Sequence, residues 1–170
     1  MVFVAALDQV PDEYEVEGPD PNYWVLTLLA VSEDEVRDVA VRTLLMPFTH
    51  DGYVAYELKF EIVIAGDEAD EVFVTQDRYM ARGYLPAEVI PMVMPCVCGA
   101  IGALVETVQP AVIYRVTKAT QPPDKALRKH QMVTERLVEL GFRVHDSGTD
   151  EFGRQFWAMT QIGDDSDGQE

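Results

Sequence analysis

Positive charge is scarce in this chain. Its 170 residues include 13 Lys and Arg against 30 Asp and Glu, which gives a formal net charge of −17 at pH 7. The field of such a protein repels phosphate, which argues against direct binding to a nucleic acid. The acids are concentrated in residues 1–77, with 18 acids and 3 bases, whereas residues 78–163 hold a slight excess of bases. This imbalance predicts either a basic protein partner or contact between two copies of the chain.

Cysteine is also rare. Cys96 and Cys98 lie two residues apart, where a disulfide between them would be strained. No second cysteine pair or nearby histidine completes a zinc site, so no metal or cofactor is expected. Residues 1–6 lack the basic segment and the length of a signal peptide. Two buried thiols in a reducing cytoplasm are the expectation.

No catalytic motif stands out. His145, Asp146 and Ser147 are consecutive, and neighbouring side chains on a strand point apart, so they do not indicate a triad. His130 interrupts an apolar helix face and is expected to be a hydrogen-bonded histidine at the edge of the core. The acidic tail 164–170, expected to be flexible, carries only part of a calcium-loop pattern.

One long stretch, Tyr84 to Val105, is almost free of charge. Prolines interrupt its first half and glycines its second, and no basic cluster follows it. These features favour a buried core helix over a membrane span. An alternative is an accessory subunit that buries this stretch at an oligomer interface.

Runs of apolar, β-branched and aromatic residues predict several strands, with the clearest alternation over 53–64. They cover residues 2–7, 23–31, 53–64, 72–75 and 111–117, with an acidic loop or arm over 8–22. Asp51-Gly52 is typical of a type I′ turn.

Residues 33–48 are ambiguous. Ser32 to Glu35 fits a capping box, which favours a short helix that becomes extended near Met46. The alternation of Val39, Val41 and Thr43 fits a strand equally well.

The chain closes with a strand, a helix and a hairpin. Asp124 is the expected N-cap of an amphipathic helix that ends at Gly141. Strands are expected at 142–146 and 154–159, joined by the loop 147–153. Together these patterns predict one α+β domain over residues 1–163, with a mainly antiparallel twisted sheet and helices packed on it.

This closing block resembles the GNAT acetyltransferase fold, whose helix typically ends in Tyr-x-x-x-Gly-Phe. The corresponding ending here is Leu137-Val-Glu-Leu-Gly141-Phe142. The block also looks like small phage-encoded proteins that keep the GNAT-like sheet without its active site. The resemblance covers roughly residues 53–160 and implies a GNAT-like C-terminal two-thirds.

Two departures bear on activity. GNAT enzymes hold the coenzyme A pyrophosphate on an Arg/Gln-x-x-Gly-x-Gly/Ala loop, and the glycines of Cys96 to Ala103 do not fit that spacing. The tyrosine that often acts as general acid falls on Leu137. The resemblance therefore implies a fold without catalytic residues. The alternative is a divergent GNAT N-acyltransferase that binds acyl-coenzyme A near Cys96 to Gly102.

We therefore expect a non-enzymatic interaction protein that acts through its acidic surface. The partner would be a basic or nucleic-acid-binding protein, and the function that of a phage or mobile-element inhibitor or nucleic-acid mimic. An ordinary solubilising surface is the simpler alternative. The carboxylates expected to bind the partner are Glu13, Glu15, Glu17, Glu57, Glu61, Glu68 and Glu71.

A basic band accompanies the predicted helix. It is either an ordinary solvated helix face or a docking surface for an acidic partner, including a second copy. Its members are Lys118, Lys125, Arg128, Lys129, Arg136 and Arg143.

Overall fold

The computed structural model describes residues 1–66, 72–75 and 81–163. The chain forms two compact units: the first contains residues 1–46 and 58–108, and the second contains 47–57 and the chain from 109 onward. Each unit combines strands with helix, so the α+β class and the mainly antiparallel pairing are confirmed. A single domain over 1–163 stays a prediction, and the tail 164–170 lies outside the described residues.

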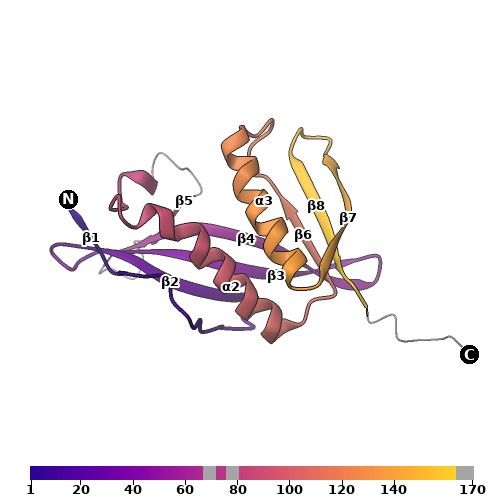
Figure 1. The fold of residues 1–170 in the computed structure, drawn as a ribbon, viewed down its shortest axis with the longest axis horizontal. Helices are drawn as coiled ribbons and strands as arrows, with labels where there is room; N and C mark the ends of the chain where they lie inside the picture. Colours follow the sequence, from indigo (N-terminus) through magenta and orange to yellow (C-terminus); the bar gives the residue numbers. More distant parts are fainter. Residues whose placement is uncertain (67–71, 76–80, 164–170) are drawn as a thin grey trace, which may run out of the picture. The chain divides into compact units, whose positions relative to one another are not determined.

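The first unit is an antiparallel sheet with helix α2 packed on it (Figure 1). Its strand order is β1-β2-β3-β4, and β5 pairs with β4. Strands β3 and β4 continue into the second unit. The elements are β1 (Phe3–Ala5), β2 (Tyr23–Ser32), β3 (Asp38–His50), β4 (Tyr53–Ala65), β5 (Val72–Thr75), η1 (Ile90–Met92) and α2 (Val93–Val108).

Helix α2 provides much of the first unit's core. The 19-residue stretch Ile90–Val108 is long and apolar enough to cross a membrane by length and composition alone. A core helix satisfies the same criteria, and α2 packs against β2, as expected of a core helix. Its buried residues are Met94, Cys96, Val97, Ala100, Ile101, Leu104 and Val105.

The helix favoured after Ser32 is wrong, because residues 38–50 form strand β3. The Ser32 hydroxyl caps a turn instead, accepting the Arg37 N–H at 2.9 Å. Val41 and Thr43 pair with Thr27 and Val25 of β2 and are buried. Pairing with a long neighbouring strand therefore outweighs a local capping signal, since strand preference is set by cross-strand packing.

The second unit begins at the tip of the β3–β4 hairpin. Asp51 and Gly52 both have positive φ, 49° and 82°, which confirms the type I′ turn. The strand order is β4-β6-β8-β7, in which β6 runs parallel to β4 and the other pairs are antiparallel. The elements are β6 (Val112–Val116), α3 (Asp124–Glu139), β7 (Phe142–Thr149) and β8 (Gln155–Gln161).

Two boundaries of the closing block differ from the prediction. The N-cap of α3 is Pro123, and Asp124 is the first helical residue. The hairpin strands are longer than expected, because Gly148 lies in the ladder opposite Phe156 rather than in the loop. Helix α3 packs on β7 (Figure 1). It buries Val133 and Leu137.

Candidate functional site

The acidic arm, residues 8–22, lies in the first unit and leads into β2. Glu13, Glu15 and Glu17 are exposed, whereas Tyr14 and Val16 between them are half-buried. Exposure thus alternates from Glu13 to Glu17 as it does along an extended segment, in which every second side chain points the same way at a spacing of about 7 Å. The three carboxylates therefore form a row on the outward side of the arm.

Two contacts hold the arm in place. Near its middle, the Tyr14 ring lies on Gly99 of α2, so closely that a Cβ at Gly99 would be 2.4 Å from the ring. Burial, together with the neighbouring Cys96 and Cys98 thiols, raises the pKa of Tyr14 to about 12. Three residues later, the Glu17 N–H donates to the Trp24 carbonyl at 2.9 Å, and the Trp24 N–H donates to the Glu17 carbonyl at 3.0 Å. The row of carboxylates is thus anchored to both α2 and β2.

The contact between Tyr14 and Gly99 makes a prediction about stability. Gly99→Ala should lower the free energy of unfolding by about 1–2 kcal/mol, because the new methyl group overlaps the tyrosine ring. In a Tyr14→Ala background the same change should stabilise the protein, by about 0.5–1 kcal/mol, because alanine is the better helix former. Urea denaturation of the four proteins measures both effects. The same sign in both backgrounds would contradict the proposed anchoring.

The other predicted carboxylates are dispersed. Glu61 is half-buried in the first unit and accepts a hydrogen bond from Arg42 Nε at 2.8 Å. Glu57 lies in the second unit, beside Tyr114 in the sheet. Glu68 and Glu71 lie outside the described residues. The structure thus brings together Glu13, Glu15 and Glu17 of the predicted set.

An aromatic platform, made of Phe48, Tyr114 and Phe156, lies in the second unit. The Tyr114 ring stacks on Phe156 with centroids 6.0 Å apart and meets Phe48 edge-on at 6.3 Å. Side chains alternate along β6 and β8, and Arg115 and Trp157 face α3. Tyr114 and Phe156 therefore lie on the opposite face of the sheet.

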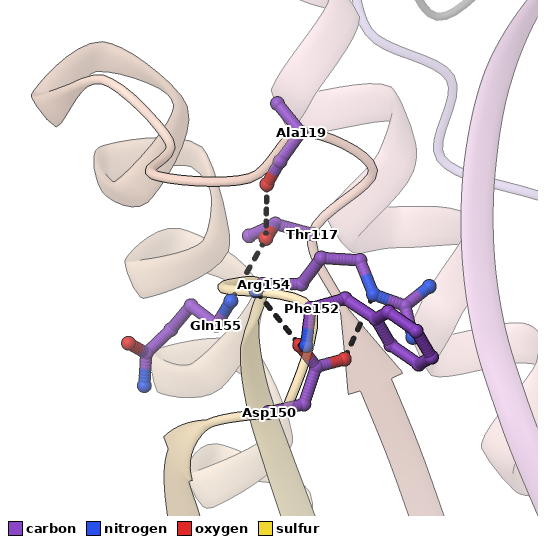
Figure 2. Close-up of polar contacts among 6 residues, drawn as sticks. All are labelled: Thr117, Ala119, Asp150, Phe152, Arg154 and Gln155. Atoms are coloured by element: carbon purple, nitrogen blue, oxygen red, sulfur yellow. Dashed lines mark hydrogen bonds and ion pairs between the residues drawn. The ribbon is translucent and has the colours of Figure 1, made fainter.

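The β7–β8 turn beside the platform is tightly bonded, as Figure 2 shows. The Asp150 carboxylate accepts the N–H groups of Phe152 and Arg154 at 2.9 and 2.8 Å, and Arg154 Nε at 2.8 Å. Burial acts to raise the pKa of Asp150, but these hydrogen bonds hold it below its ordinary value. Gly153 takes the positive φ that the turn requires, 78°. The turn presents Phe152, whose side chain is 63% exposed.

A second contact in Figure 2 joins this hairpin to the segment after β6. The Thr117 hydroxyl donates to the Ala119 carbonyl and accepts the Gln155 N–H, both at 3.0 Å. Thr117 is itself buried. The β8 end of the turn is therefore fixed relative to the strand that carries Tyr114.

A buried arginine lies between β6, β8 and α3. Arg115 is 2% exposed, and its guanidinium donates to the His130 carbonyl at 3.0 Å and to the Thr134 hydroxyl. The guanidinium carbon lies 4.9 Å from the Trp157 ring, on which His130 also stacks at 5.0 Å. Burial lowers the pKa of Arg115 to about 10. Burial and the nearby Arg115 charge lower the pKa of His130 to about 4.

This cluster is part of the core between β6, β8 and α3. The half-buried His130 ring stacked against Trp157 agrees with the predicted position at the edge of the core, and the predicted hydrogen bond of the ring stays a prediction. Arg136 of the basic band pairs with Glu139 at 3.1 Å, as on an ordinary solvated helix face. Arg115 is not among the predicted site residues, and its signal in the sequence is a single charge in the middle of an apolar strand.

Within residues 1–66, 72–75 and 81–163, no group of His, Cys, Asp and Glu is arranged to hold a metal ion. Comparison with known proteins finds no family model, no curated protein and no solved structure that matches this chain. Its function is therefore inferred from the arrangement of its own side chains.

Proposed function

We propose that this chain is a non-enzymatic interaction protein whose acidic arm binds a basic protein partner. The observation that carries the proposal is the row of exposed carboxylates of Glu13, Glu15 and Glu17, held by the anchors at Tyr14 and Glu17. A binding segment that is already ordered loses less entropy when its partner arrives. The net charge of −17 adds long-range attraction for a basic protein and speeds association.

The proposal extends to an inhibitor or nucleic-acid mimic of the kind that phages and mobile elements encode, acting in the cytoplasm. A regular row of single negative charges is what one strand of a nucleic acid presents to its protein partners. The alternation of outward carboxylates and inward Tyr14 and Val16 supplies such a row. A GNAT-like sheet that has lost its active site is the scaffold we propose, and the parallel β4–β6 pair supports it.

Charge reversal of the arm tests the proposal. A partner is first isolated from host extract on the wild-type protein, and its affinity is then measured for Glu13→Lys/Glu15→Lys/Glu17→Lys. We expect binding about tenfold weaker, or lost, at low ionic strength, and a smaller difference at high salt, where surface charges are screened.

The matched control is Glu33→Lys/Glu88→Lys/Glu106→Lys, which makes the same change in net charge at exposed positions of the first unit outside the arm. A specific arm surface requires the control to weaken binding much less. Equal losses in the two variants would mean that only the overall field attracts the partner.

The divergent acyltransferase is the second candidate. The parallel neighbours β4 and β6 pair over only two residue pairs, Tyr56–Ile113 and Glu57–Tyr114, and short pairing of this kind favours a GNAT-type arrangement. A ligand that binds the folded state raises the melting temperature. If acyl-coenzyme A does so at millimolar concentration, the non-enzymatic proposal fails.

A further inference from the structure

We propose that the aromatic platform of the second unit binds a cationic side chain, arginine or lysine, of the basic partner. This inference rests on the proposed function, since the side chain belongs to the same class of partner. It assigns a second surface, in the unit that does not contain the acidic arm.

Acidic residues lie on both sides of Tyr114 in the sheet. Tyr114 of β6 pairs with Glu57 of β4 on one side and with Ala158 of β8 on the other. Ala158 pairs in turn with Asp146 of β7. Residues in register on neighbouring strands share a face and lie about 5 Å apart. The Tyr114 position is thus flanked in the sheet by acidic residues on both sides, Glu57 one strand away, at a backbone spacing of about 5 Å, and Asp146 two strands away, at about 10 Å.

The three rings of the platform are partly accessible to solvent. Tyr114 and Phe156 are half-buried, and Phe48 is 37% exposed. Helix α3 lies on the opposite face, where it contacts Arg115 and Trp157. Rings that pack on one another and remain partly open to solvent give a firm surface on which a flat guanidinium can lie.

Charged side chains of both signs lie near Tyr114. Burial raises the pKa of Tyr114, as do the negative charges of Asp150, Glu57 and Asp146, whereas the Arg154 charge lowers it. Asp150 and Arg154 form an ion pair at 2.8 Å, so their two charges largely offset each other and the Glu57 and Asp146 carboxylates remain. Arg143 pairs with Thr160, two residues further along β8 than Ala158, the partner of Tyr114, so its positive charge belongs to the neighbouring set of cross-strand partners. Negative charge next to π-faces favours a cation and opposes a phosphate or an acidic peptide.

The test uses the full chain and a short oligo-arginine peptide, with an oligo-citrulline peptide of equal length as the uncharged probe. In NMR titrations the ring protons of Tyr114 and Phe156 should shift with oligo-arginine and not with oligo-citrulline. Tyr114→Leu and Phe156→Leu should each weaken oligo-arginine binding about fivefold, as expected for loss of a partly desolvated cation–π contact. Tyr114→Phe should stay within about twofold of wild type, because the π-face remains.

Tyr53→Leu is the matched control, since Tyr53 is a 74% exposed aromatic residue of the same unit outside the platform. It should leave affinity unchanged, and thermal melts should show that every variant is folded. If Glu13→Lys/Glu15→Lys/Glu17→Lys lost affinity for oligo-arginine while Tyr114→Leu and Phe156→Leu kept it, the platform would be overturned and the proposed function would remain intact. Ring shifts produced equally by oligo-citrulline, or by an oligothymidylate in place of oligo-arginine, would overturn the cationic occupant.

Discussion

Arg115→Ala is expected to lower the free energy of unfolding by about 3 kcal/mol or more. The side chain is 2% exposed and fills the space between β6, β8 and α3. Its removal leaves a cavity and takes away the donors to the His130 carbonyl and the Thr134 hydroxyl. It also removes the contact with the Trp157 ring, 4.9 Å from the guanidinium carbon. Urea denaturation at neutral pH measures the loss.

Arg115→Met is the control that separates volume from charge. Methionine restores most of the volume and can pack against Trp157, while the buried charge disappears with its desolvation cost. We expect a loss of less than about 1.5 kcal/mol. If Arg115→Met destabilised the protein as much as Arg115→Ala, the guanidinium hydrogen bonds rather than the packing would hold this part of the core together.

Acidification should destabilise the protein through His130. Its pKa falls from 6.5 to about 4 in the folded state because of burial and the neighbouring Arg115 and Lys129 charges. Above about pH 6.5 the imidazole is neutral in both states, whereas between about pH 6.5 and pH 4 the unfolded chain takes up the proton more readily. Stability is therefore lost as pH falls through this window. With allowance for the partial exposure of the ring, we expect the free energy of unfolding to fall by about 2 kcal/mol across this window.

His130→Phe isolates this contribution, because phenylalanine keeps the stack on Trp157 and cannot be protonated. The difference in stability between wild type and His130→Phe should change by about 2 kcal/mol between about pH 7 and pH 4.5. His145→Gln, at an exposed position of β7, is the matched control and should follow the wild-type curve. A pH-independent difference for His130→Phe would show that the ring protonates as easily in the folded protein as in the unfolded chain.

Much of the strand pattern could be predicted because it is local. The alternation in β4 and the runs of apolar and β-branched residues in β2 and β6 predict strands from short segments, without knowledge of the partner strand. The same holds for the apolar faces of α2 and α3. The structure of residues 38–46 could not be predicted in this way, because helix and strand periods fit the sequence equally well. Pairing with β2 makes this segment a strand.

The candidate surfaces divide in the same way. The exposure of Glu13, Glu15 and Glu17 follows from the sequence, since six acids in a proline-containing segment predict a solvated arm. The arm is held in place because Tyr14 contacts Gly99, a residue 85 positions further along the chain.

The platform is a purely tertiary feature. Phe48, Tyr114 and Phe156 belong to three separate strands, and Glu57 and Asp146 flank Tyr114 only through the register of four strands. The sequence by itself determined the negative charge, the α+β class and most element positions, because composition and periodicity are properties of short segments. The tertiary structure decided the neighbours of Tyr14, Arg115 and Tyr114, because cross-strand register and helix packing join residues whose spacing in the chain contains no sign of their contact.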